Sequence, residues 1–169
     1  PKNIFLEGFR MPGEWEVQKS VWIVWPYNKE DWPGLFTNIP NVISKIVSSI
    51  PQNERCSVLS VEPDADYNRT VVTIAGSPED VYIAAYKLIE SAVKLIDMTN
   101  HQGEHPRLGV VDVCPFIPLN NYSMADCSSL AEKLAKSVAK NLGVSTFLYG
   151  YSATHEDRKL LSTLRKGEY

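Results

Sequence analysis

The residues best suited to chemistry lie together in one short segment. His105 lies in a stretch rich in glycine and proline, between an expected helix and an expected strand, where protein scaffolds often present functional groups. Its imidazole can exchange a proton near neutral pH, which makes His105 a candidate general acid or base. A single loop histidine can equally be a surface residue, but Glu104, His101 and Arg107 add a carboxylate, a second imidazole and a guanidinium within seven residues. This concentration favours a functional role.

A metal site is the alternative use of the same segment. His101, Glu104 and His105 could supply nitrogen and oxygen ligands, and the four-residue step between the histidines matches one helical turn. However, Gly103 and Pro106 make the segment a poor helix, and no third histidine or cysteine follows at a suitable spacing. The sequence therefore favours chemistry without a metal.

Asp112 is the second candidate, because it interrupts an otherwise apolar run, Val110-Val111-Asp112-Val113-Cys114. A charge at such a position is costly unless it is paired. Asp112 could orient His105 or face a substrate, or it could lie on the exposed face of a strand. We interpret Cys114, like Cys127, as a small core residue and not as a nucleophile.

Arg69 is the third candidate and lies where an expected strand begins. The turn before it, residues 62–68, carries three acids and an amide and is typical of a solvated turn. The guanidinium of Arg69 is the exception, since it can bind a carboxylate in bidentate fashion.

The elements that must position these residues follow from hydrophobic spacing and from capping signals such as Ser77-Pro78 and Ser123 to Asp126. We expect strands at residues 21–25, 56–61, 69–75, 109–117 and 144–149, and helices at residues 42–50, 78–98 and 124–142. The second and third strands should form a hairpin. This order predicts an α+β, ferredoxin-like (split βαβ) sheet with helices packed on one face.

The composition limits the classes of function. The chain has 169 residues, 44% of them hydrophobic and 22% charged, with a net charge of -3. One compact domain is expected, with no broad nucleic-acid-binding face and no membrane-spanning segment. Three cysteines without a CxxC spacing argue against a disulfide framework and favour a cytoplasmic protein.

Residues from about 56 to 169 resemble the amino-terminal subdomain of glutamate formiminotransferases. The matching blocks include Asn68-Arg69-Thr70, Leu95-Ile96-Asp97-Met98, the run from His101 to Pro118, and Arg165-Lys166-Gly167-Glu168-Tyr169. The resemblance implies transfer of a formimino group from N-formiminoglutamate to N5 of tetrahydrofolate, with His105 as the catalytic acid and base. Glu62 falls where the family has an aspartate.

The first part of the chain resembles a different family. Gly8-Phe9-Arg10-Met11-Pro12-Gly13-Glu14-Trp15-Glu16 and Asp31-Trp32-Pro33-Gly34 are similar to the opening of agmatine deiminase and bacterial peptidylarginine deiminase-like proteins, without a counterpart of their catalytic residues. We therefore predict a deiminase-like segment at residues 1–55 and a formiminotransferase-like part at residues 56–169, joined as a chimera within one compact domain.

These observations predict a formiminotransferase with His105 as the base. The candidates for binding substrate or folate are Arg69, Arg107, Asp112 and Glu62. Tetrahydrofolate is the expected co-substrate, and the expected partners are small molecules together with a second copy of the chain or a missing carboxyl-terminal subdomain. The alternative is a non-catalytic folate-binding or scaffold domain, in which the tryptophan-rich first forty residues would form an interface.

Overall fold

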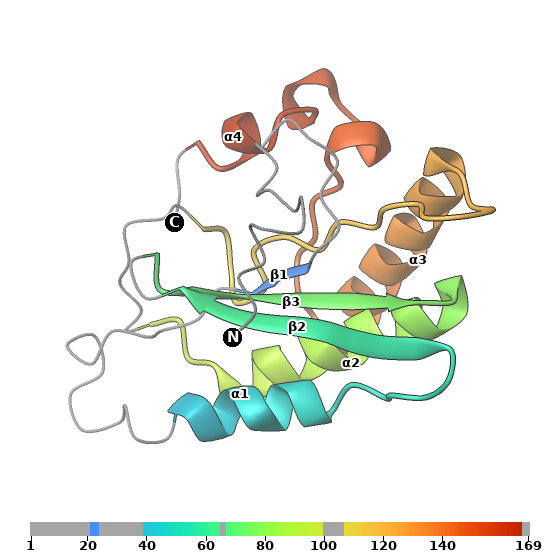
Figure 1. The fold of residues 1–169 in the computed structure, drawn as a ribbon. Coiled ribbons are helices and arrows are strands. Elements are labelled where there is room, and N and C mark those ends of the chain that lie inside the picture. The colour runs from blue at the N-terminus through green and yellow to red at the C-terminus, as the bar shows by residue number, and fades with distance from the viewer. Residues whose placement is uncertain (1–20, 24–38, 65–66, 100–106, 167–169) are drawn as a thin grey trace, which may run out of the picture.

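The described part of the chain forms a small antiparallel sheet and four α-helices and is therefore α+β (Figure 1). The computed structural model describes residues 21–23, 39–64, 67–99 and 107–166. Its elements are β1 (Val21–Ile23), α1 (Ile39–Ser48), β2 (Cys56–Asp64), β3 (Arg69–Gly76), α2 (Pro78–Leu95), α3 (Met124–Leu142), the 3-10 helices η4 (Gly150–Ser152) and η5 (Glu156–Arg158), and α4 (Leu161–Leu164). Among these described residues, no helix is long and apolar enough to cross a membrane.

The sheet has the strand order β1-β3-β2, and both pairs are antiparallel. The hairpin of β2 and β3 confirms the sequence prediction, and β2 extends to Asp64, three residues beyond the predicted end. Its last pair joins Asp64 to Arg69. Asn68, in the connecting turn, has a φ of 51° and is buried, and asparagine tolerates this left-handed conformation better than most residues.

The two long helices begin at the predicted caps. The Ser77 hydroxyl accepts a hydrogen bond from the Asp80 amide at 3.4 Å, and Ser123 and Asp126 form a reciprocal capping box. Helix α3 ends at Gly143, whose φ of 69° suits a residue without a Cβ. Helix α2 ends at Leu95, three residues earlier than predicted.

The hydrophobic core lies between the sheet and the helices. Helices α1 and α2 lie on the same side of the sheet, below it in Figure 1, and the segment from η4 to α4 lies above it. Val72 of β3, Ile46 of α1, Leu88 of α2 and Val138 of α3 are buried in one cluster. Successive side chains along a strand point to opposite faces of the sheet. Arg69 and Val72 are three positions apart on β3, so their side chains lie on opposite faces. Because Val72 faces the core with α1 and α2, Arg69 points to the other side of the sheet.

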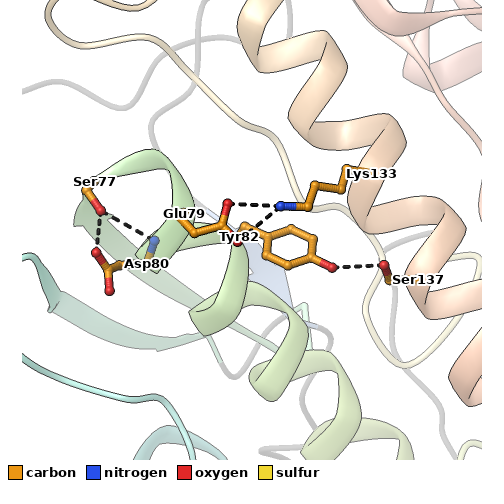
Figure 2. A network of polar contacts seen from close by, with 6 residues as sticks. All are labelled: Ser77, Glu79, Asp80, Tyr82, Lys133 and Ser137. Carbon is orange, nitrogen blue, oxygen red and sulfur yellow. Dashed lines mark hydrogen bonds and ion pairs between the residues drawn. The ribbon is translucent and has the colours of Figure 1, made fainter.

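Polar contacts join α2 to α3 at the surface (Figure 2). The Tyr82 hydroxyl lies 2.8 Å from the Ser137 hydroxyl. Lys133 donates to Glu79 at 2.9 Å, and its ammonium lies 4.3 Å from the centroid of the Tyr82 ring. These contacts fix the register of the two helices.

Two predicted strands, at residues 109–117 and 144–149, are wrong. The described backbone there is irregular, and Val113 makes only an isolated bridge. The apolar residues of these segments still pack against the core, among them Val111, Phe116 and Val144. An apolar run indicates that a segment is buried. A strand also needs hydrogen bonds to a neighbouring strand, and the described residues do not form them here.

Candidate functional site

A buried ion pair joins Asp112 to Arg165, near the end of the described chain. One carboxylate oxygen of Asp112 accepts a hydrogen bond from Nη2 of Arg165, and the other accepts one from the backbone N–H of Leu108 at 3.0 Å. Only 4% of the Asp112 side chain and 9% of the Arg165 side chain are exposed. The charge of Asp112 is thus paired, as its apolar surroundings required, and the alternative of an exposed strand face is wrong.

Arg69 lies close enough to this pair to interact with it electrostatically. Burial lowers the pKa of Arg69, whereas the charges of Asp64, Tyr67 and Asp112 raise it and that of Arg165 lowers it further. Its guanidinium also lies 4.7 Å from the centroid of the Tyr67 ring, a cation–π contact. Two guanidinium groups and one buried carboxylate therefore share one region, which we call the Asp112 cluster: Arg69, Asp112 and Arg165.

Tyr149 and Cys114 adjoin the Asp112 cluster and are neutral at physiological pH. Burial raises the pKa of the Tyr149 phenol, with further contributions from Cys114 and Asp112 that Arg165 partly opposes. Burial also raises the pKa of the Cys114 thiol to about 12. Cys114 packs against the hydrophobic core, and Cys127 is buried in α3. Both cysteines are therefore core residues, as predicted. Because the thiolate is the nucleophilic form, the raised pKa of Cys114 also makes it a poor nucleophile.

Two polar atoms near the sheet are buried without a hydrogen-bond partner among the described residues. They are Nε of Arg165 and the hydroxyl oxygen of Thr70 on β3. A buried donor without a partner costs roughly 1–3 kcal/mol. Among the described residues, the guanidinium of Arg165 hydrogen-bonds to Asp112 through Nη2.

The remaining candidates divide into described and undescribed residues. Glu62 is exposed on β2, opposite Val71 of β3 in the hairpin register, and no contact places it in the Asp112 cluster. Arg107 is half-buried and directly precedes Leu108. The catalytic candidate His105 lies outside the described residues, as do His101 and Glu104. Within the described ranges, no three His, Cys, Asp or Glu side chains come close enough to hold a metal ion.

The sequence reasoning did not single out Arg165 as a site residue. Two signals pointed to it. Asp112 required a cation because of its apolar surroundings, and Arg165 begins one of the blocks that resemble the formiminotransferases. Sequence separation hid the connection, since the two partners are 53 positions apart.

The described residues define an α+β domain with α1 and α2 on one side of a small sheet and a buried ion pair between Asp112 and Arg165. Residues 37–169 match the family model of the formiminotransferase domain, N-terminal subdomain. The chain belongs to this family. The match includes α1 and begins at residue 37, whereas the sequence motifs gave a likeness from about residue 56.

Curated relatives carry the same family name. The chain is 41% identical over 128 residues to a formimidoyltransferase-cyclodeaminase of Dictyostelium discoideum, a match that covers 76% of this chain and 24% of the relative. The corresponding protein of Gallus gallus is 43% identical, with the same coverage. A glutamate formimidoyltransferase of Streptococcus pyogenes serotype M1 is 37% identical over 76% of this chain and 43% of the relative. The chain thus spans less than half the length of these relatives.

Proposed function

We propose that this chain is the amino-terminal part of an enzyme that transfers a formimino group from N-formiminoglutamate to N5 of tetrahydrofolate. The observation that carries the proposal is the family match over residues 37–169, a range that includes the segment Glu104-His105-Pro106-Arg107. The relatives named formimidoyltransferase support the same reaction. Tetrahydrofolate is then a co-substrate, and the reaction needs no metal ion.

The proposed chemistry follows from the groups that react. N5 of tetrahydrofolate attacks the formimino carbon and forms a new C–N bond, while N5 loses a proton to His105. The bond between the formimino carbon and the glutamate nitrogen then breaks, and His105 returns the proton to the departing amine. Holding both substrates in one orientation lowers the entropic part of the barrier.

The charged residues of the Asp112 cluster suit an acidic substrate. Arg69 is proposed to bind a carboxylate of N-formiminoglutamate in bidentate fashion. Arg107 adds a cation beside the histidine segment, and Asp112 orients that segment through Leu108. Glu62 is the weakest candidate of the set, because its side chain is exposed on β2.

A ferredoxin-like topology is part of the proposal. In its support, α1 connects β1 to β2, β3 lies between these strands and antiparallel to both, and α2 follows β3. These are the first five elements of a split βαβ unit.

The rest of the catalytic unit is proposed to come from a carboxyl-terminal subdomain or from a second copy of the chain. The relatives support this step, since the chain covers only 24% to 43% of their length. The three cysteines are free thiols, which supports a reducing, cytoplasmic setting.

Binding and turnover test the proposal together. Isothermal titration with tetrahydrofolate, and separately with N-formiminoglutamate, should give saturable binding. A formimino-transfer assay with the carboxyl-terminal subdomain supplied should show turnover that His105→Ala abolishes. His155→Ala is the matched control, because His155 is an exposed histidine just before η5. Folate binding without transfer would favour the non-catalytic alternative, and no binding at millimolar ligand would contradict the proposed function.

A further inference from the structure

The carboxylate of Asp112 connects two separate parts of the chain. One oxygen binds the Arg165 guanidinium at the end of α4, and the other binds the backbone N–H of Leu108. Leu108 follows His105 by three residues. Three residues of extended chain reach at most about 11 Å, so the backbone position of Leu108 limits where the imidazole of His105 can be.

We infer that Arg165 is a positioning residue, which acts through Asp112 to fix the backbone at Leu108 and thereby the carboxyl-terminal end of the segment that bears His105. This inference rests on the proposed function for the role of His105. The contacts of Asp112 with Arg165 and with Leu108 belong to the described structure, and their effect on Leu108 can be tested without turnover.

A role in stability alone explains the pair poorly. Removing two charges from water is costly, and well-packed apolar residues are often as stabilising as a buried ion pair. Directional contacts are what an apolar pair would lack. Asp112 uses both oxygens for different partners, so its orientation depends on Arg165, and the Leu108 amide depends on that orientation.

Only Pro106 and Arg107 stand between His105 and Leu108 in the sequence. Pro106 has a fixed φ and therefore removes one rotation from this short path. A displacement of about 1 Å at a reacting group can lower a rate by roughly a hundredfold. Loss of the Arg165 contact should therefore affect the rate of the chemical step more than the affinity for substrates.

Hydrogen exchange at the Leu108 amide is the direct test, measured by NMR on the 169-residue chain. Arg165→Met should accelerate exchange at Leu108 by at least about tenfold, while the amides of Ile74 in β3 and Leu88 in α2 change by less than about threefold. Arg158→Met is the matched control, because Arg158 lies in the same part of the chain and stacks on Phe147 at 5.4 Å. Unchanged exchange at Leu108, or equal acceleration at all three amides, would overturn the inference.

Two further variants keep the test decisive if Arg165→Met unfolds. Arg165→Lys retains a cation and should restore most of the protection at Leu108. Asp112→Leu with Arg165→Met removes both charges, so that none is left buried without a partner. This double variant should fold and still exchange rapidly at Leu108. Slow exchange at Leu108 in the folded double variant would show that the pair does not fix this backbone.

Turnover separates positioning from the proposed function. In the formimino-transfer assay, Arg165→Met should lower kcat by tenfold to a hundredfold and leave KM for tetrahydrofolate within about twofold, with partial rescue by Arg165→Lys. An unchanged kcat in a variant with rapid exchange at Leu108 would contradict the positioning role. Absence of turnover in the unmodified chain, also when the carboxyl-terminal subdomain is supplied, would instead contradict the proposed function, and the exchange result would still decide whether Arg165 fixes Leu108.

Discussion

The hydroxyl groups of Tyr82 on α2 and Ser137 on α3 lie 2.8 Å apart, 55 residues distant in sequence. This contact, with the neighbouring Lys133 and Glu79 pair, joins the two longest helices of the described chain (Figure 2). The Lys133 and Glu79 side chains are half exposed or more, and such surface pairs contribute little. The half-buried hydroxyl pair is therefore the stronger polar contact between α2 and α3.

Tyr82→Phe should destabilise the chain by about 1 kcal/mol, because it removes one hydrogen bond and leaves the Ser137 hydroxyl without this partner. Chemical denaturation monitored by circular dichroism measures the free energy of unfolding. Tyr86→Phe is the control, since Tyr86 packs against the same core and its hydroxyl makes no hydrogen bond within the described part of the chain. Equal effects of the two variants would contradict a specific role of the Tyr82–Ser137 contact.

Local signals in the sequence predicted much of the fold correctly. Helices α2 and α3 begin at Ser77 and Ser123 as predicted, because a capping side chain and the backbone it binds are close in sequence. The hairpin of β2 and β3 was also predictable, since its two strands are adjacent in the chain. Caps and hairpins depend on residues that are close to one another in the sequence.

Features that depend on distant partners were not predictable in the same way. The segments 109–117 and 144–149 have the composition of strands, but pairing depends on where another strand lies. Arg165 was missed for the same reason, because its partner Asp112 lies far away in sequence. The need of Asp112 for a cation was visible, but the identity of that cation was not.

The capping box of α3 predicts a stability contribution that acid removes. The hydroxyl and amide of Ser123 hydrogen-bond to the Asp126 carboxylate, and these bonds hold the pKa of Asp126 below its usual value of 3.8. A carboxyl with a lowered pKa in the folded state stabilises the fold above its unfolded pKa, and this contribution is lost as the pH falls through the folded value. The contribution should therefore be present above pH 3.8, the usual pKa, and be lost as the pH falls through the lower pKa of the folded state.

Thermal unfolding between pH 2 and pH 6 tests this expectation. Asp126→Asn should lower the melting temperature at pH 6 and have a smaller effect at the acid end of the range. Ser123→Ala should cost about 1 kcal/mol at neutral pH. Equal effects of Asp126→Asn at both ends of the range would show that the ionised carboxylate is not the stabilising form.

The thiols of the described chain should react slowly with alkylating reagents. Burial raises the pKa of Cys114 to about 12, and it also raises those of Cys56 and Cys127. Only the thiolate is nucleophilic, so iodoacetamide at pH 8 should label the folded chain far more slowly than the chain in guanidinium chloride. Mass spectrometry after timed quenching measures this ratio, and rapid labelling of Cys114 in the folded chain would contradict its assignment as a core residue.

Gly76, at the end of β3, should not tolerate a side chain. A Cβ at this position would lie 2.2 Å from the carbonyl oxygen of Arg55 and 2.7 Å from Cα of Cys56, and backbone atoms cannot move aside as a flexible side chain can. Gly76→Ala should therefore displace the end of β3 relative to β2 and destabilise the chain by about 1–3 kcal/mol or more. Gly109→Ala is the matched control, because a Cβ there meets no atom within 4 Å. Denaturant unfolding compares the two variants, and a Gly76→Ala chain as stable as Gly109→Ala would show that β2 and β3 do not approach as closely as described.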